Sequence, residues 1–496
     1  MKYLPLVLFL FFIVSMILSL LYFDYKMTAM ETVNNMGLGY NFANTFECYN
    51  KFEEIKTPEE QITLWGNIVP TKNMISKLKR YGFKTIRLPI TWINFIDSTG
   101  KIDSEWLSYI RNVIDWIIND NNMFCIINVH GDGKDDNWLS KGISVKNIFI
   151  NLWKQIAEEF INYDEHLIFE SVDNPNYYIS YDSYDFDTLL VMTQAFIDTI
   201  RSTGGNNKDR LLLISGANSQ IEIVCTDNYK LPNDPSNKIA LTINYFIPSS
   251  FCLEKRDTKW GTETDYKEMF IEFETLKKAY IDKGIPVIIT AYSILTEENK
   301  EKESIREYIY FENSLASSYN GMSSFIWDTS TADMNFYDRE NDKWFDEEIQ
   351  KSLKKISRGK LISPLDFSYV SNIDTVNSTS NGNMKIKIGR RRVLTAIFNI
   401  KIIDNYSWSV GFGITGFDRN GVWLGIQVNG DIGRKEYDGT YTYIVDISYK
   451  DYNDYVEIQQ WWGGEIIYNY FSLEFEQSHT FFDYNKYKNA FLNNNI

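Results

Sequence analysis

The fold is decided by the segment Cys125-Ile-Ile-Asn-Val-His130 and by the two segments that come after it in the chain. This short, largely apolar run is rich in β-branched residues, which is typical of a buried strand. Residues 145–161 then place apolar side chains three and four apart, as in an amphipathic helix, and Leu167 to Val172 is a second run of the first kind. This order predicts a βαβ unit with parallel strands.

The same alternation extends from about residue 36 to 330 and includes eight segments of strand character. They are Met36 to Asn41, Thr85 to Pro89, Cys125 to His130, Leu167 to Val172, Leu211 to Ser215, Ala240 to Tyr245, Pro286 to Thr290 and Ser323 to Trp327. Eight such units predict an α/β fold, a closed (β/α)8 TIM barrel. In such barrels the functional residues lie at the C-terminal ends of the strands.

The pattern changes after residue 360. Residues 371–383 are polar, and residues 384–475 contain short alternating segments separated by Gly, Asn and Asp, which predict an antiparallel β-sandwich. We therefore expect a barrel over residues 28–360, a linker over 361–383, a β-sandwich over 384–476 and a tail over 477–496.

The N-terminal segment differs from both predicted domains. Leu4 to Phe23 has no charged residue over 20 positions, which is long enough to cross a bilayer as a helix. A cleaved signal peptide has a shorter apolar core and small residues at its cleavage site, so residues 1–27 favour a signal anchor, with a signal peptide as the alternative. The flanking charges favour a cytoplasmic N-terminus. The remaining chain is then extracellular, either membrane-anchored or secreted.

Composition excludes several classes of function. The chain has 50 Lys and Arg against 66 Asp and Glu, a net charge of −16, and no dense basic run, which argues against a nucleic-acid partner. Its four cysteines form no CxxC pair and its three histidines are scattered, so we expect no metal and no cofactor. The 13 Trp, 33 Tyr and 32 Phe offer flat rings of the kind that suit the apolar faces of sugars.

The predicted strand ends carry motifs of a known family. They include Ile-Arg87-Leu-Pro, Ile-Asn-Val-His130, Ile-Asn244-Tyr245-Phe and Phe-Ile-Trp327-Asp, together with Gly37-Leu-Gly-Tyr-Asn-Phe-Ala-Asn-Thr45 and Trp65-Gly-Asn67. Over about residues 28–350 the chain resembles glycoside hydrolase family 5, the barrels of retaining endoglucanases and xyloglucanases. The resemblance implies a cleft for β-glucan or a related cell-wall polysaccharide, lined by Arg87, His130, Asn244, Tyr245 and Trp327. Asn244 stands where the family has a histidine.

Both catalytic positions depart from the family. The fourth strand ends Asp173-Asn174-Pro175 where the family has Asn-Glu-Pro, so Asn174 replaces the acid and base, and Ala291 replaces the nucleophile. Retaining hydrolysis needs two carboxyl groups roughly 5 to 5.5 Å apart, and neither an amide nor a methyl group supplies that chemistry. Asp173 and Glu170 are the nearest substitutes. Strand alternation turns Asp173 to the opposite face, and Glu170 is typical of a structural carboxylate.

These residues leave three hypotheses open. The first is a noncatalytic pseudoenzyme that binds β-glucan, and the second is an active endo-β-glucanase with displaced carboxylates. The third is a protein-interaction scaffold. Two carboxyl groups within about 6 Å at the barrel mouth would favour the second. A filled mouth without an exposed tryptophan would favour the third.

The predicted sandwich has its own candidate residues. The segment Val456-Glu-Ile-Gln-Gln-Trp461-Trp462-Gly-Gly-Glu465 resembles the tryptophan-rich strand of carbohydrate-binding β-sandwich modules. Candidate sugar platforms are Trp408, Trp423, Trp461 and Trp462. Strand alternation is expected to bury about half of them.

Overall fold

The computed structural model describes two compact parts of the chain. The first covers residues 26–50, 54–130, 138–175, 178–180, 183–296 and 300–359. The second covers strand segments at 373–376, 384–391, 393–402, 409–417, 423–433, 440–446, 453–462 and 466–475. The expected anchor Leu4 to Phe23 and tail 477–496 lie outside the described residues. Across the described ranges, no helix is long and apolar enough to span a membrane.

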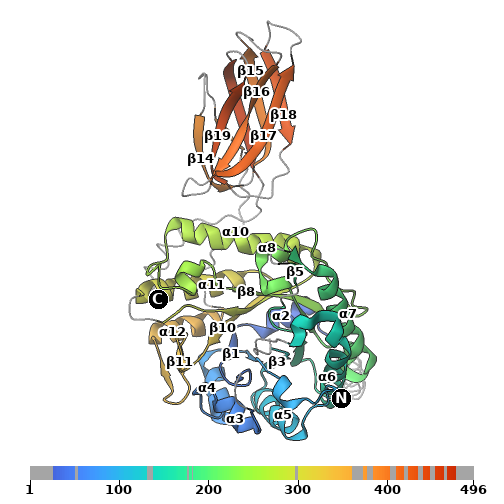
Figure 1. Cartoon of the computed structure of the whole chain (residues 1–496). Helices are drawn as coiled ribbons and strands as arrows, with labels where there is room; N and C mark the ends of the chain where they lie inside the picture. The colour runs from blue at the N-terminus through green and yellow to red at the C-terminus, as the bar shows by residue number, and fades with distance from the viewer. Residues whose placement is uncertain are drawn as a thin grey trace, which may run out of the picture. The chain divides into compact units, whose positions relative to one another are not determined.

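The first part is a closed parallel barrel (Figure 1). Its strands are β1 (Gly39–Phe42), β2 (Thr85–Leu88), β3 (Phe124–Asn128), β4 (Leu167–Glu170), β7 (Leu212–Ser215), β8 (Ile239–Tyr245), β9 (Val287–Tyr292) and β10 (Met322–Asp328). They are hydrogen-bonded in the order β1-β10-β9-β8-β7-β4-β3-β2, with β1 also paired to β2. The predicted (β/α)8 barrel is confirmed.

Helices surround the barrel (Figure 1). They are α2 (Ala29–Met36), α3 (Pro58–Thr63), α4 (Lys72–Tyr81), α5 (Ser104–Ile118), α6 (Lys146–Glu159), α7 (Phe186–Ser202), α8 (Ile221–Val224), α9 (Ser249–Cys252), α10 (Glu263–Ala279), α11 (Lys302–Ser318) and α12 (Glu347–Ile356). Short strand pairs β5 (Tyr178–Ser180) with β6 (Ser183–Tyr184), and β11 (Tyr337–Asp338) with β12 (Lys343–Trp344), lie in the connections. Thr71 and Thr262 cap α4 and α10 by accepting backbone N–H groups, which fixes where these helices begin.

Apolar side chains fill the N-terminal end of the barrel. Val33 and Met36 of α2 pack there against residues that include Ile126, Ile168, Leu213, Ala240, Ile288 and Phe325. β1 approaches β10 closely at Gly39, where an added Cβ would lie 1.8 Å from the ring of Phe325. Because this end is filled, functional side chains gather at the other end, where the strands terminate.

The second part consists of two four-stranded antiparallel sheets, as predicted. One sheet has the order β13-β20-β15-β18 and the other β14-β19-β16-β17. Their bounds are β13 (Ile373–Val376), β14 (Met384–Arg391), β15 (Val393–Ile402), β16 (Ser409–Phe417), β17 (Trp423–Gly433), β18 (Thr440–Asp446), β19 (Asn453–Trp462) and β20 (Ile466–Phe475). β13 lies inside the stretch expected as a linker and pairs with β20. The rest of that stretch lies outside the described residues.

Candidate functional site

Arg87 is the centre of a polar group at the C-terminal ends of the barrel strands. Its guanidinium donates from Nε to Oε2 of Glu170 at 2.6 Å and from Nη2 to Oε1 of Glu170 at 2.9 Å. The same Nη2 atom donates to Oδ1 of Asp173 at 2.7 Å. Arg87 is 0% exposed, so it cannot touch a substrate. This corrects the expectation that Arg87 lines the cleft, because it positions two carboxylates instead.

Two amides that the sequence reasoning missed hold this group in place. Asn41 accepts from Nη1 of Arg87 at 3.0 Å and donates to the carbonyl oxygen of Thr290 at 2.8 Å. Asn128 donates to Oε2 of Glu170 at 3.3 Å. Each amide lies in an otherwise largely apolar strand. A polar residue inside such a strand was the sequence signal that could have identified Asn41 and Asn128.

Burial sets the charges of the group. Burial raises the pKa of Glu170, against the opposing effect of Arg87. Burial also acts to raise the pKa of Asp173, but His130 and Arg87 together lower it by more than burial raises it. The pKa of Asp173 therefore lies below its ordinary value. For His130, burial lowers the pKa to about 4, so the imidazole is neutral at pH 7. Within the described ranges, no group of three or more His, Cys, Asp or Glu residues is arranged to hold a metal ion.

Neither expected catalytic position holds a carboxylate. Asn174 is exposed and has a backbone φ of 44°, in the left-handed region that asparagine tolerates better than most residues. Ala291 on β9 is 3% exposed and lies in register with Asn244 of β8. An amide and a methyl group therefore stand at the two positions where the resemblance to family 5 predicts an acid and a nucleophile.

Glu170 and Asp173 are the nearest carboxylates to these positions. Both accept from the same nitrogen of Arg87, so two of their oxygens lie within about 6 Å of one another. That distance meets the criterion for displaced catalysis. However, an acid and a nucleophile must flank the scissile bond, whereas these two carboxylates converge on one guanidinium and Glu170 is fully buried. The arrangement is suited to holding Arg87.

The end of β8 differs from the sequence expectation. Asn244 is partly exposed, and its Oδ1 accepts from the hydroxyl of Thr290 at 3.0 Å. Tyr245 is 1% exposed, and its hydroxyl donates at 2.6 Å to Glu272 on α10, outside the barrel. Tyr245 therefore does not line the mouth, because strand alternation turns it toward the helices. Phe246, the next residue, is partly exposed and was missed.

His130 and Trp327 form an aromatic pair at the strand ends. Their rings are stacked, with centroids 5.7 Å apart and an angle of 20° between planes. Both are partly exposed, and Nε2 of His130 lies 3.7 Å from Oδ2 of Asp173. The neutral imidazole thus connects the Arg87 group to a partly exposed indole. That His130 and Trp327 line a sugar-binding mouth stays a prediction.

Trp65 is a further exposed aromatic on the same side of the barrel. It is 37% exposed and contacts Tyr49 edge to face, with ring centroids 5.3 Å apart. Nearby, the amide of Asn67 donates to the carbonyl oxygens of Asn44 and Thr329, which come after β1 and β10. The segment that carries Trp65 is thereby attached to loops at the C-terminal ends of strands. The motif Trp65-Gly-Asn67 was the signal, although its indole was not expected as a site residue.

One face of the second unit carries three aromatic residues, of which one is exposed and two are partly exposed. Trp423 on β17 is 59% exposed and lies in register with Phe417 of β16, which in turn lies in register with Tyr455 of β19. The ammonium group of Lys385 lies 4.4 Å from the ring centroid of Phe417 and 5.2 Å from that of Tyr455. These side chains therefore share one face, and we call them the aromatic row.

The four tryptophans expected in this unit have different outcomes. Trp461 is partly exposed and comes after Tyr455 on the same strand at an even spacing, so it shares the face of the aromatic row. Trp408 and the side chain of Trp462 lie outside the described residues. The alternation of buried Val456 and Ile458 along β19 was the signal that would have identified Tyr455.

Comparisons with known proteins agree with the barrel fold. The family model Cellulase (glycosyl hydrolase family 5) matches residues 43–333. A solved GH5-4 broad specificity endoglucanase from an uncultured bovine rumen ciliate is 48% identical, with a TM-score of 0.65, over 67% of this chain and 99% of that chain.

Two curated relatives are both named Endoglucanase A. The one from Paenibacillus barcinonensis is 31% identical over 56% of this chain and 76% of its own length. The one from Clostridium longisporum is 29% identical over 66% of this chain, and the chain spans 65% of its length. With its closed parallel barrel and a family model that matches more than half of its residues, the chain belongs to glycosyl hydrolase family 5.

Proposed function

We propose that this protein is a noncatalytic member of family 5 that binds β-glucan or a related cell-wall polysaccharide outside the cell. The single observation that carries the proposal is the pair Asn174 and Ala291 at the two catalytic positions. Glu170 and Asp173 do not replace them, because both are bound to buried Arg87. Without an acid and a nucleophile the barrel can hold a glucan but not cleave it.

Exposed aromatic rings support the binding half of the proposal. Trp327 and Trp65 on the barrel are accessible, and flat rings contribute most when they bury apolar area against a ligand. Many of the matched proteins are named endoglucanases, and one solved relative from family 5 is titled as a complex with cellotriose. A β-glucan is therefore the ligand class that fits the family and the rings.

The aromatic row favours a second binding surface on the other unit. Trp423, Phe417 and Tyr455 lie on adjacent strands, which are about 4.8 Å apart in a sheet. Three neighbouring rings present a longer platform than a single side chain. We propose that this face also binds polysaccharide. Each of the two surfaces belongs to its own unit and has its own test.

The test combines a reducing-sugar assay with a pull-down on cellulose, xyloglucan and mixed-linkage glucan. Retention on at least one glucan without release of reducing ends is the expected result. The matched control is an active family 5 endoglucanase under the same conditions. Sustained release of reducing ends by this protein at ordinary enzyme rates would contradict the proposal.

An active hydrolase is the alternative, and one observation favours it. Glu170 and Asp173 lie close enough to one another for retaining chemistry. If they catalyse hydrolysis, Asp173→Asn must abolish turnover while the protein still binds glucan. If turnover is absent from the unchanged protein, this alternative fails. Loss of both turnover and glucan binding would instead point to the interaction scaffold.

We also propose that residues 1–27 anchor the protein in a membrane, on the basis of the uncharged run Leu4 to Phe23. The expected result is recovery of the full-length protein in the membrane fraction, with release by detergent but not by high salt. A mature protein that begins near residue 28 and stays in the medium would identify a signal peptide instead.

A further inference from the structure

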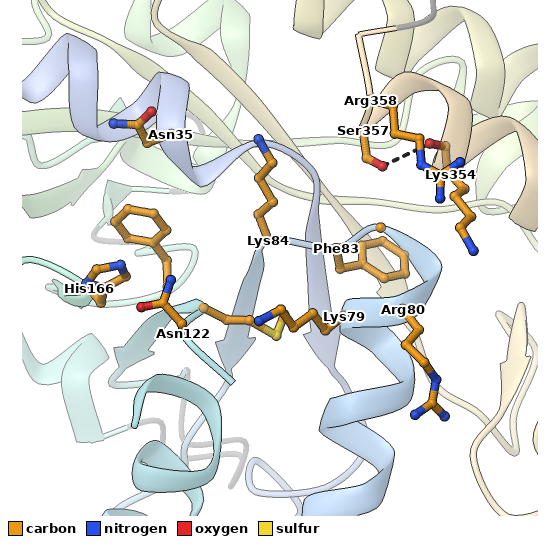
Figure 2. A pocket seen from close by; sticks show the side chains of 13 residues that line it. Asn35, Lys79, Arg80, Phe83, Lys84, Asn122, His166, Lys354, Ser357 and Arg358 are labelled. Atoms are coloured by element: carbon orange, nitrogen blue, oxygen red, sulfur yellow. Dashed lines mark hydrogen bonds between the residues drawn. The ribbon is translucent and has the colours of Figure 1, made fainter. Parts of the chain in front are cut away.

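A basic pocket lies at the N-terminal end of the barrel, opposite the mouth. Its volume is about 380 Å³, and it is lined by the residues that precede β2, β3 and β4 and by the ends of α4 and α12 (Figure 2). Its titratable lining residues are Lys79, Arg80, Lys84, His166, Lys354 and Arg358. Among the described residues, no Asp or Glu contributes to the lining, although the whole chain has 66 acidic residues against 50 basic ones.

Most of these cations lack a carboxylate partner. Four of them form no ion pair with a carboxylate in the described part of the chain: Arg80, Lys84, Lys354 and Arg358. Other cations of α4 behave differently, since Lys72 pairs with Asp120 and Lys77 with Asp342, each at 2.8 Å. Cations of α4 that lie away from the pocket therefore have carboxylate partners, whereas Arg80, which lines the pocket, has none among the described residues.

Helix ends account for only part of this arrangement. Lys79, Arg80 and Lys354 lie in the last turns of α4 and α12, where cations interact favourably with the helix dipole. Lys84 belongs to no helix, and its alkyl chain lies against Gly37, where an added Cβ would be 2.9 Å from Cδ of Lys84. Interaction with a helix dipole therefore does not explain why Lys84 lies at the pocket.

The floor of the pocket is apolar. Phe83 and Phe124 are buried there, and the ring of Phe124 stacks on His166 with centroids 4.6 Å apart. A hydrogen bond to the carboxylate of Asp164 raises the pKa of His166, with Nδ1 of the imidazole 3.1 Å from Oδ1 of Asp164. A cationic rim over an apolar floor is suited to a compact anion.

We propose that the basic pocket binds a small ligand that carries two or more phosphate groups. Five Lys and Arg side chains around one opening attract a ligand with several negative charges. Phosphate oxygens accept from both guanidinium and ammonium groups, and such charge-assisted hydrogen bonds are short and strong. The volume lies within the range of small-molecule sites, which favours a compact ligand over a polymer. This site is separate from the mouth, and the inference does not depend on glucan binding.

The test is calorimetric titration of the full-length protein, purified in mild detergent, with inorganic tripolyphosphate at low ionic strength. We expect saturable binding that weakens as salt is added, because screening reduces the attraction. The double variant Lys84→Gln/Arg358→Gln should bind at least about tenfold more weakly. The matched control is Lys355→Gln, which removes a cation from the same helix α12 outside the pocket and should leave the affinity unchanged.

Several results would overturn the proposal. They are the absence of saturable binding to the unchanged protein, equal affinity in the double variant, and an equal loss of affinity in Lys355→Gln. Citrate is the comparison ligand, and citrate binding as tight as that of tripolyphosphate would exclude a phosphate site.

Thermal unfolding gives an independent readout. Without ligand, the double variant should melt at the same or a higher temperature, because removing neighbouring cations relieves repulsion. A lower melting temperature with unchanged tripolyphosphate affinity would mean that Lys84 and Arg358 stabilise the fold, and it would overturn the site.

Discussion

Arg87 binds Asp173 through the same nitrogen that binds Glu170, at 2.7 and 2.9 Å. The family motif has an asparagine at position 173 and a glutamate at position 291, whereas this chain has Asp173 and Ala291. This chain therefore has one carboxylate where the motif has an amide, and it lacks both glutamates of the motif, at positions 174 and 291. Asn41 joins Arg87 to the backbone of Thr290, immediately before Ala291, so the two changes lie in one hydrogen-bonded group. We interpret Asp173 as a second anion on Arg87, beside Glu170.

The first prediction concerns recovery of hydrolysis. Asn174→Glu/Ala291→Glu should give weak release of reducing sugar, and the addition of Asp173→Asn should raise the rate by about tenfold or more. The reason is that Asp173 competes with the carboxylate introduced at position 291 for Arg87. Each single variant serves as a control and should be inactive, because acid and nucleophile act as a unit.

One result of this experiment would contradict the prediction. A triple variant that folds and binds glucan but is no faster than the double variant would mean that Asp173 is not the competing anion. Two obstacles limit the expected rate. Position 174 has a φ of 44°, which disfavours glutamate, and Ala291 is buried, which raises the pKa of a carboxyl group placed there.

The second prediction concerns the barrel mouth. Trp327→Ala should weaken retention on insoluble glucan by about 1 to 2 kcal/mol, because the indole no longer stacks on a sugar ring. Tyr245→Phe is the control, since the hydroxyl of Tyr245 binds Glu272 away from the mouth, and its glucan affinity should be unchanged. Equilibrium depletion binding measures both. Equal affinity of Trp327→Ala and the unchanged protein would remove Trp327 from the binding site.

The third prediction concerns the aromatic row. Trp423→Ala should reduce binding to the same polysaccharides, by about 1 kcal/mol if the exposed ring stacks on sugar. Leu253→Ala, which removes another exposed apolar side chain from the barrel, is the control and should have no effect. Affinity electrophoresis in gels that contain soluble glucan compares the two variants. If both migrate as the unchanged protein does, the second unit does not bind these glucans through this face.

The fourth prediction concerns pH and stability. Burial raises the pKa of Glu312 on α11 to about 8 and that of Glu47 to about 7. For each group the folded pKa lies above the unfolded value of 4.5. The contribution of the group to the stability of the fold is therefore complete below pH 4.5 and is lost as pH rises through the folded pKa, about 7 for Glu47 and about 8 for Glu312. The melting temperature should therefore fall between pH 6.5 and 8.5. His130 acts in the opposite direction but only below pH 6.5, where the unfolded chain takes up a proton that the folded chain excludes.

Glu312→Gln tests the assignment directly. The amide keeps an acceptor for the hydroxyl of Ser324 and cannot ionise, so the fall in melting temperature between pH 6.5 and 8.5 should become shallower. Glu347→Gln on α12 is the control, because that side chain is largely exposed and should not change the slope. An unaltered slope in Glu312→Gln would mean that other groups set the pH dependence.

The barrel was predictable because each strand is a short apolar run between helical segments, a pattern that burial on both faces imposes. The positions of Asn174 and Ala291 were equally readable, since they belong to motifs local to one strand end. Tyr245 was not, because one residue of strand register decides whether a ring faces the mouth or the helices. The role of Asp173 was also hidden, because its partner Arg87 is distant in sequence and only the closed barrel brings them together.

Removal of one partner from a buried ion pair commonly costs about 3 to 5 kcal/mol, which is a large fraction of the stability of a domain. Arg87 and Glu170 form such a pair, and Asn41 and Asn128 hold it. The stability of the fold alone is therefore sufficient to account for these four residues, whether or not a barrel hydrolyses its ligand. A buried group of this kind is then poor evidence of activity in a barrel of this family. Positions 174 and 291 are free of this constraint, so inactive relatives are best recognised by the residues at these two positions.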